Sequence, residues 1–464
     1  MEDILHSRLQ SINMTTTKKT ASKKPGDAPA KKTPQPLSSV RGMRDILPAD
    51  QPYWRMAFEA AQKICDAYSF DRIETPVLEE TSLFVRGVGK QTDIVEKEMY
   101  SFETSGGDKV TMRPENTAAI CRSYIQHGML NQPQPVKLWY WSSMFRHERP
   151  QSGRYREFWQ FGAEMLGDED AVVDAQLALV SWKYLQSLGI DSVVRINSIG
   201  TPESRLNYRN ALVAYFRPKR SRMSDEDKKR LLKNPLRLLD SKDPLIAEMK
   251  MEAPQIVDWL DEPSKNHFMQ VLEYLDEVGV PYQLDPFLVR GLDYYTRTVF
   301  ELFETNDDQS QNQNALGGGG RYDGLMELLG GKETPAAGFS MGIDRVVSLL
   351  KSREDITPPS EQTEVFVAQL GESGRKRALA LFEELRAAGI KASESFSKSS
   401  IKTQMDNANR LGAKWTLIIG QKEVLDGTVI IRDMDAGTQE IIDAQKMIQE
   451  LKKKMIQKSA EAAN

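Results

Sequence analysis

The first part of the chain with a regular pattern carries apolar residues at helical spacing. In residues 51–70 they recur every three or four positions, at Trp54, Ala57, Phe58, Ala61, Ile64, Cys65 and Tyr68. Because this spacing gathers them on one face, it predicts an amphipathic helix. A second helix is predicted over residues 170–188, closed by Gly189, and the run SVVRINSIG after it has the composition of a strand.

Two patterns alternate through the middle of the chain. Between residues 97 and 166, runs such as KVTMR and VKLWYWSSMFRHE, separated by Gly, Asn and Pro, predict antiparallel strands. Residues 203–280 are instead charged and nearly free of strand signals, and Ser224 begins a capping-box pattern that would start a helix. Strand-like, glycine-rich segments return over residues 282–350. The pattern predicts a β-rich domain with a helical insertion at about residues 203–280.

A linker separates this domain from a second one. Residues 354–363 (EDITPPSEQT) contain one large apolar residue and a pair of prolines, which is typical of a linker. Beyond it, the strand-like runs VFVAQL, IKASES, WTLIIG and TVIIRDM alternate with helices predicted over residues 375–388, 400–411 and 438–457. We therefore expect one domain over residues 40–353 and a compact α/β domain over residues 364–464.

Composition limits the partners and the cellular compartment that we expect for this protein. Lys and Arg total 62 against 66 for Asp and Glu, a net charge of −4, so any nucleic-acid surface must be a local patch. No run approaches the roughly 20 apolar residues of a membrane helix, so no membrane partner is expected. Residues 1–39 form a Lys-rich tail that we predict to be disordered, since residues 15–36 lack Leu, Ile, Val and aromatic residues. Cys65, Cys121 and four histidines show no zinc spacing and favour a cytoplasmic protein without a protein-bound metal.

Arginines, glycines and acidic residues gather in four clusters. They are RPENT at 113–117, FRHERPQSGRYREF at 145–158, LVRGLDYYTRTVFE at 288–301, and GGGGRYDG at 317–324 with GFSMGIDR at 338–345. Guanidiniums bind phosphate in a bidentate manner, and glycines let a backbone approach a ligand. Taken alone, an arginine-rich loop is also typical of a solvated surface. A glycine run taken alone is also typical of a turn. A nucleotide-binding oxidoreductase is disfavoured because GGGGRYDG lacks the G-x-G-x-x-G spacing.

Together the four clusters resemble those of histidyl-tRNA synthetases, a family of class II aminoacyl-tRNA synthetases. FRHERPQSGRYREF is similar to motif 2 and GFSMGIDR to motif 3 of the class. LVRGLDYYTRTVFE and GGGGRYDGL resemble the two signatures of the histidine enzymes, and RGMRD at residues 41–45 resembles their opening. The likeness runs from about residue 40 to the end of the sequence. It implies an α+β fold, in which an antiparallel sheet flanked by helices is followed by a smaller α/β anticodon-binding domain.

The resemblance implies the reaction of a histidine–tRNA ligase. L-Histidine and ATP would form histidyl-adenylate, and the histidyl group would pass to the 3′ end of the histidine tRNA. By motif match, Arg146 would hold the α-phosphate and Arg345 the γ-phosphate, while Phe158 stacks on adenine near Glu148. Arg290 would contact the histidine carboxylate and the α-phosphate, where other class II enzymes use a metal ion. Mg²⁺ is expected to accompany ATP through the β- and γ-phosphates.

The same resemblance assigns ligands to the amino group of histidine. They are Glu115, Thr117 and Gln160. Asn116, between two of these ligands, is also assigned to the histidine-binding residues, and it stands where the family frequently has Gly. Because both residue types tolerate a positive φ, we expect the turn at this position to be preserved.

The imidazole ring would be bound by a second set of residues. Glu164 and Tyr295 match the groups that hydrogen-bond the ring, and Tyr294 and Tyr322 would line the pocket. Residues 158, 160 and 164 share one face of a predicted strand, so adenine, amino group and ring could be bound in sequence along it.

The loop between the motif 2 strands would reach the tRNA. It is the short RPQSGR form of bacterial enzymes, which makes Arg149 and Gln151 candidates for binding the acceptor end with its extra 5′ guanosine. Members of this class are usually homodimers. The alternative function is a synthetase-like regulatory subunit of the histidine-biosynthetic ATP phosphoribosyltransferase. Such paralogues lack the anticodon domain and parts of the catalytic signatures, both of which this sequence keeps.

Overall fold

The computed structural model describes residues 37–89, 92–148, 154–239, 241, 243–305, 315–356, 358 and 363–462. The predicted tail lies outside these residues up to position 36. Arg149 and Gln151, the two predicted contacts with the tRNA acceptor end, also lie outside them.

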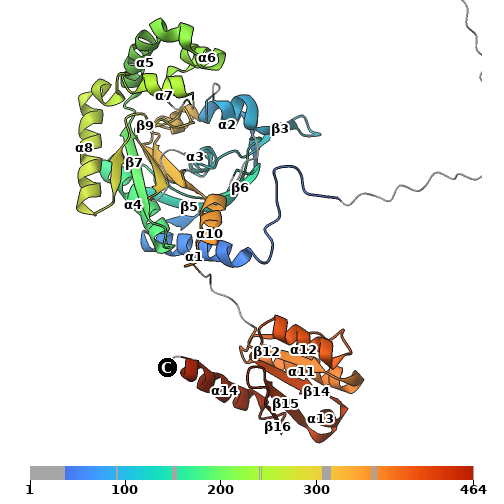
Figure 1. The fold of residues 1–464 in the computed structure, drawn as a ribbon. Coiled ribbons are helices and arrows are strands. Elements are labelled where there is room, and N and C mark those ends of the chain that lie inside the picture. The colour runs from blue at the N-terminus through green and yellow to red at the C-terminus, as the bar shows by residue number, and fades with distance from the viewer. Residues whose placement is uncertain are drawn as a thin grey trace, which may run out of the picture.

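A large, mostly antiparallel sheet forms the centre of the first domain (Figure 1). Its strands lie in the order β1-β5-β6-β11-β10-β9-β7-β8. Their bounds are Asp71–Arg72 (β1), Val136–Phe145 (β5), Glu157–Leu166 (β6), Ala336–Gly342 (β11), Gly317–Arg321 (β10), Thr296–Glu304 (β9), Ser192–Ser198 (β7) and Tyr282–Leu284 (β8). The pairs β1–β5 and β7–β8 are parallel and the others are antiparallel. The expected antiparallel sheet is therefore confirmed.

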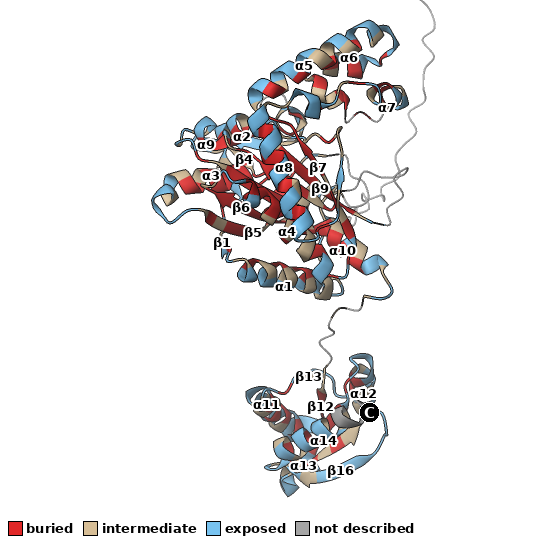
Figure 2. Cartoon of the chain, turned by 90° about the vertical axis from the view of Figure 1, so that its left-hand side faces the viewer, coloured by how far each residue is buried: buried red, intermediate tan, exposed pale blue. Residues whose placement is uncertain are grey.

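Four helices pack on one face of this sheet. They are α1 (Gln51–Ala67), α4 (Ala171–Ser187), α8 (Glu262–Glu277) and α10 (Ile343–Ser352). Figure 2 shows α4 and α8 side by side against the sheet, with buried residues turned inward and exposed residues outward. The predicted face of α1 is buried as expected at Trp54, Ala57, Ala61 and Cys65. Helix α4 begins at its N-cap Asp170, whose side chain accepts a hydrogen bond from the Val172 N–H, and Gly189 follows it with φ +72°.

The opposite face of the sheet carries the remaining helices of this domain. Helices α2 (Thr81–Gly87) and α3 (Thr117–Gln126) lie beside a small sheet of β2 (Leu78–Glu80), β4 (Lys109–Met112) and β3 (Tyr100–Glu103), and α9 (Leu325–Leu328) packs on α2 and α3. The helical segment contributes α5 (Pro202–Phe216), α6 (Asp225–Lys233) and α7 (Pro244–Lys250) to a second apolar core. Ser224 caps α6 as expected, accepting from the Asp227 N–H.

Helix α8 differs from the rest of the segment at residues 203–280. It buries Phe268, Val271 and Leu275 in the core between the sheet and α4, so it belongs with the helices of that face. Charge and helical periodicity extend over α5 to α8 without a break. The sequence pattern therefore did not separate the helices of the insertion from a helix of the main core.

Two elements of the first domain differ from the sequence predictions. The run with Arg290 and Tyr295 was predicted within a strand, but β9 begins only at Thr296, and the preceding residues form a loop. The glycine run, by contrast, is the central strand β10. A Cβ at Gly319 would lie 2.7 Å from Phe339 Cα, so these glycines permit close approach to neighbouring strands.

The C-terminal residues form a separate sheet with its own apolar core. Its strands are β12 (Val365–Gln369), β13 (Ala392–Glu394), β14 (Trp415–Ile419), β15 (Thr428–Asp433) and β16 (Gln439–Asp443), in the order β13-β12-β14-β15-β16. Its helices are α11 (Gly371–Ala387), α12 (Ile401–Arg410), α13 (Gln421–Asp426) and α14 (Met447–Ala462). None of the helices in the described ranges is long and apolar enough to span a membrane.

The predicted helix over residues 438–457 was wrong over residues 438–446. Residues 439–443 pair antiparallel with β15, and α14 begins only at Met447. The turn is closed by Gly437, which has φ +70° and permits a tight hairpin. This strand was not predicted because QEIID fits a helical as well as a strand pattern.

Candidate active site

A cavity of about 990 Å³ lies on the face of the large sheet opposite α4. Most of the predicted site residues line it. They are Glu115, Thr117, Arg146, Glu148, Phe158, Gln160, Arg290, Tyr294, Tyr295, Tyr322 and Arg345. They come from five segments, namely the start of α3, the β5–β6 hairpin, the loop before β9, the end of β10 and the start of α10. The structure thus brings residues more than two hundred positions apart into one site.

One end of the cavity is positively charged. Arg146 follows β5, where its Nε donates to the Pro114 carbonyl at 2.8 Å, and its guanidinium lies 5.2 Å from the Phe158 ring centroid. Glu148 lies 3.9 Å from Arg146 and 3.5 Å from Arg154. Arg345, in the first turn of α10, donates to the Ala315 carbonyl at 2.5 Å. Burial, reinforced by the nearby Arg154, lowers the pKa of Arg345, but a guanidinium remains charged at neutral pH.

Arg290 lies between this charged end and the rest of the cavity. Its Nη1 forms an ion pair with Glu301 on β9, and its guanidinium lies 5.7 Å from the Tyr295 ring centroid. A Cβ on Gly318 would meet Nη1 at 2.8 Å, so the bare backbone of β10 leaves room for this side chain. Burial disfavours the charge, but Glu301 and Tyr295 outweigh it and raise the pKa of Arg290 above its ordinary value. The arginine is therefore a permanent cation.

The other end of the cavity presents hydrogen-bonding groups. The buried Glu115 carboxylate accepts from the backbone N–H groups of Thr117 at 2.8 Å and Ala118 at 3.1 Å, at the start of α3. Burial raises the pKa of Glu115, and these two donors oppose the shift. Gln160 donates to Ser340 at 3.3 Å, and its Oε1 is buried without a partner among the described residues. That oxygen can accept from a bound ammonium group.

Glu164 lies immediately behind the cavity wall. Its carboxylate is 1 % exposed, accepts from Thr117 Oγ1 at 2.8 Å and forms a second hydrogen bond with the Tyr322 hydroxyl. It sits over Gly338 of β11, where a Cβ would overlap the Glu164 carboxylate. Burial raises the pKa of Glu164 to about 8, against the effect of the two hydroxyl donors. Residues 158, 160 and 164 lie on the same face of β6, as predicted from strand alternation.

The backbone at Asn116 differs from the prediction. Its φ is −112°, which any residue adopts, so no tolerance of positive φ is required there. The side chain is fully buried, and its Oδ1 accepts from Thr75 Oγ1 at 2.7 Å. Asn116 therefore lies outside the cavity, where it joins the start of α3 to the segment before β2.

Two charged residues of the site were not singled out in the sequence. Arg195 on β7 and Glu301 on β9 are paired in register and line the cavity, and the Arg195 guanidinium lies 4.0 Å from the Phe303 ring centroid. Each is a charge within an otherwise apolar strand, SVVRINS and TRTVFELFE. A charge that interrupts the buried face of a strand is the signal that could have identified them.

The burial of Glu164 predicts a pH-dependent stability. The pKa of an unfolded glutamate is about 4.3, so the folded protein, with a pKa of about 8 at Glu164, binds this proton more tightly. The stabilisation from this proton is complete below about pH 4 and is lost as the pH rises towards 8. We expect Glu164→Gln, which does not ionise, to gain stability relative to the wild type between about pH 5 and pH 9 in urea unfolding. Parallel curves for the two proteins would contradict a buried, protonated Glu164.

This chain has a large, mostly antiparallel sheet, with four helices on one face and a charged cavity on the other. This is the architecture of class II aminoacyl-tRNA synthetases. Two family models identify which family of this class the chain resembles. Residues 42–199 and 223–346 match the model described as histidyl-tRNA synthetase, and residues 364–454 match that of an anticodon binding domain. The chain belongs to the histidyl-tRNA synthetase family.

Individual relatives agree with this assignment. The chain is 44 % identical over 418 residues to the histidine–tRNA ligase of Dehalococcoides mccartyi, covering 90 % of this chain and 99 % of that protein. The chain is also 42 % identical over 415 residues to the histidine–tRNA ligase of Thermosynechococcus vestitus, covering 89 % of this chain and 96 % of that protein. Apo histidyl-tRNA synthetase from S. aureus superposes with a TM-score of 0.74 at 37 % identity, covering 90 % of this chain and all of that one.

One structural neighbour bears on the alternative function. A protein from Bacillus halodurans C, described as an ATP phosphoribosyltransferase regulatory subunit/histidyl-tRNA synthetase, has a TM-score of 0.60 at 22 % identity, covering 84 % of this chain and 99 % of that one. At this identity the likeness shows a shared fold alone.

Proposed function

We propose that this protein activates L-histidine with ATP to histidyl-adenylate, releasing pyrophosphate, and then transfers the histidyl group to the 3′ end of the histidine tRNA. The proposal rests on one observation, namely that one end of the cavity is positively charged and the other end presents hydrogen-bonding groups. Three arginines, Arg146, Arg290 and Arg345, line one end of the cavity. Thr117 and Tyr322, which hydrogen-bond the Glu164 carboxylate, line the other end. A triphosphate fits the first end, and a small ring with nitrogen donors fits the second.

The arginines supply the electrostatics of the first step. Attack of the histidine carboxylate on the α-phosphorus builds negative charge on the phosphoryl oxygens, which fixed cations stabilise. Arg146 is anchored by the Pro114 carbonyl and Arg290 by Glu301, so both cations are held in place before the reaction. Arg290 is assigned to the histidine carboxylate and the α-phosphate together, Arg146 to the α-phosphate and Arg345 to the γ-phosphate. Phe158 and Glu148 are assigned to adenine.

The polar end of the cavity fits the amino acid. The amino group is assigned to Glu115, Thr117 and Gln160, all three of which line the cavity. The imidazole is assigned to Glu164 and Tyr295, with Tyr294 and Tyr322 as walls. Thr117 and Tyr322 hold the Glu164 carboxylate from two directions. In this position a carboxylate accepts a hydrogen bond from an N–H group of the imidazole ring. An amino acid with an apolar side chain of equal size has no such donor.

Mg²⁺ enters this proposal with ATP, bound through the β- and γ-phosphates. Among the described residues, no group of three or more His, Cys, Asp or Glu is placed to hold a metal ion. Two carboxylates that line the cavity, Glu148 and Glu301, are ion-paired with arginines. The proposal therefore assigns Mg²⁺ to the phosphates of ATP, and no step is assigned to a metal held by side chains alone.

The proposal extends to the partners. The match at residues 364–454 supports an anticodon-binding role for the C-terminal domain, with the catalytic unit over residues 40–353 and the linker at 354–363. Arg149 and Gln151 remain assigned to the acceptor end from the family resemblance, since in the sequence they fall between the segments that form β5 and β6. A homodimer is proposed from the family. The two free, buried cysteines support a reducing, cytoplasmic setting.

Two assays distinguish the ligase from the regulatory subunit. We expect ATP–pyrophosphate exchange that depends on histidine, and aminoacylation of a histidine tRNA transcript with its extra 5′ guanosine. A transcript without that guanosine is expected to be charged at least about tenfold more slowly. Absence of histidine-dependent exchange would favour the regulatory alternative. Equal charging of both transcripts would remove the assignment of Arg149 and Gln151.

A further inference from the structure

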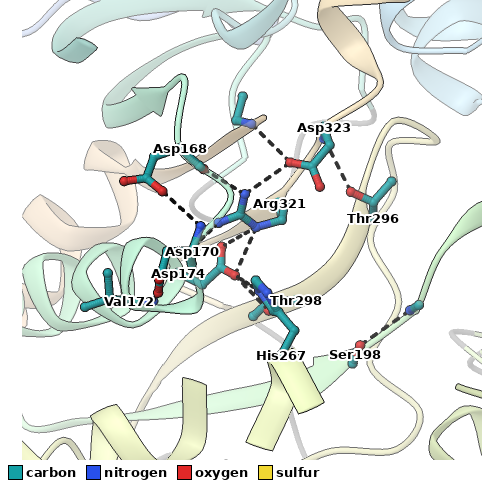
Figure 3. A network of polar contacts seen from close by, with 12 residues as sticks. Asp168, Asp170, Val172, Asp174, Ser198, His267, Thr296, Thr298, Arg321 and Asp323 are labelled. Carbon is teal, nitrogen blue, oxygen red and sulfur yellow. Dashed lines mark hydrogen bonds and ion pairs between the residues drawn. The ribbon is translucent and has the colours of Figure 1, made fainter. Parts of the chain in front are cut away.

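A polar network centred on buried charges lies behind the active site, on the side of the sheet that faces α4 and α8 (Figure 3). At its centre is Arg321, the last residue of β10, which has no exposed surface. Its Nε donates to both oxygens of Asp174 at 3.1 Å, its Nη1 to Asp323 Oδ1 at 3.2 Å, and the two terminal nitrogens to the carbonyls of Asp168 and Asp170 at 3.0 Å. Every nitrogen of this guanidinium therefore has a partner.

Asp174, on α4, collects the remaining contacts. Besides Arg321, its Oδ2 accepts from Thr298 Oγ1 of β9 at 3.2 Å and lies 2.5 Å from Nε2 of His267 on α8. Asp174 is 1 % and His267 7 % exposed. One carboxylate thus ties two helices to two neighbouring strands of the sheet. Neither it nor His267 lines the cavity, and the proposed reaction uses neither.

The network adjoins the residue that holds Glu164. Tyr322 directly follows Arg321, and its hydroxyl hydrogen-bonds the Glu164 carboxylate. Successive residues of an extended chain point to opposite faces, so Arg321 anchored behind the sheet directs Tyr322 into the cavity. Asp323, the residue after Tyr322, is held from both sides, because its Oδ1 also accepts from the Ala336 N–H at 3.1 Å. Tyr322 is therefore fixed at both of its neighbours.

We propose that Asp174 and His267 are positioning residues for histidine recognition. They hold Arg321, Arg321 sets the direction of Tyr322, and Tyr322 holds the Glu164 carboxylate against the imidazole ring. This inference rests on the proposed function, since it specifies how the amino-acid end of that cavity is kept in shape. Buried ion pairs contribute little net stability compared with apolar packing, and their best-supported use is to specify one arrangement.

The test uses the full-length protein and histidine-dependent pyrophosphate exchange. Asp174→Asn keeps the shape of the side chain but removes the charge that holds Arg321. We expect the KM for histidine to rise about fivefold and the KM for ATP to change by less than about twofold. Direct titration of histidine by calorimetry, without ATP, is expected to show the same loss of affinity. Wild-type exchange in the same assay tests the proposed function separately.

His267 provides a rescue experiment, which also serves if Asp174→Asn does not fold. His267→Ala removes the nitrogen beside Asp174, whereas His267→Gln offers an amide N–H at similar reach. We expect the alanine variant to weaken histidine binding about threefold and the glutamine variant to recover most of it. Val271→Ala is the matched control, because Val271 is buried one turn further along α8 and its apolar side chain takes no part in the hydrogen bonds of the network. It should lower the melting temperature and leave the KM for histidine unchanged.

The proposal is overturned if Asp174→Asn leaves the KM for histidine unchanged, or raises the KM values for histidine and ATP equally. It is also overturned if Val271→Ala and His267→Ala raise the KM for histidine to the same extent. Either result would make the network a contributor to stability alone.

Discussion

Replacing Arg290 by alanine is expected to lower the rate of adenylate formation about 100- to 1,000-fold while ATP binding changes far less. The guanidinium is fixed by Glu301 and Tyr295 at the point where the cavity changes from cationic to polar. In the proposed reaction it meets charge that grows in the transition state, and one such fixed donor contributes about 2.7–4 kcal/mol. Presteady-state measurement of adenylate formation at saturating ATP tests this directly.

Two further variants make the Arg290 experiment specific. Arg290→Lys is also expected to be slow, because one ammonium cannot span a carboxylate and a phosphate together. Arg353→Ala is the matched control, since Arg353 is likewise paired with a carboxylate, Asp355, but does not line the cavity. It should form adenylate at the wild-type rate. Near-normal pyrophosphate exchange in either Arg290 variant would exclude the assigned role.

Replacing Glu164 by alanine is expected to raise the KM for histidine about tenfold or more and to leave the KM for ATP nearly unchanged. The carboxylate is buried and held by Thr117 and Tyr322, so its loss removes the proposed ring acceptor and leaves two hydroxyls without a partner. A lost hydrogen bond costs about 0.5–1.5 kcal/mol, and a buried hydroxyl left without a partner costs about 1–3 kcal/mol more. Steady-state exchange kinetics with each substrate varied in turn measures the two constants.

Glu79→Ala provides the control for this experiment. Glu79 is a similarly shielded carboxylate, paired with Arg122 at 2.5 Å on the small sheet, and it does not line the cavity. It should lower stability without changing either KM. If Glu164→Ala changes both KM values equally, or neither, Glu164 does not bind the imidazole.

Residues that are close in the sequence could be assigned from the sequence. The motif 2 strands, the face of β6 that carries residues 158, 160 and 164, and the apolar face of α1 all follow from spacing, because strand and helix periods act over a few residues. The cluster motifs also identified eleven residues that line the cavity, whereas Arg195 and Glu301 were not singled out. The resemblance to histidyl-tRNA synthetases added their roles, which spacing alone left open.

Features that depend on partners far along the chain were decided only by the tertiary structure. The glycines of β10 form a central strand because neighbouring strands approach too closely for a Cβ, and the partner strands are not visible in a local pattern. Asn116 has an ordinary φ, and its buried side chain is held by Thr75, which is 41 positions away in the sequence. Arg321 and Asp174 are 147 positions apart, and His267 and Asp174 are 93. Local periodicity determined which residues face the core and the cavity, whereas long-range burial determined which polar groups pair there, because only the fold removes their competing water.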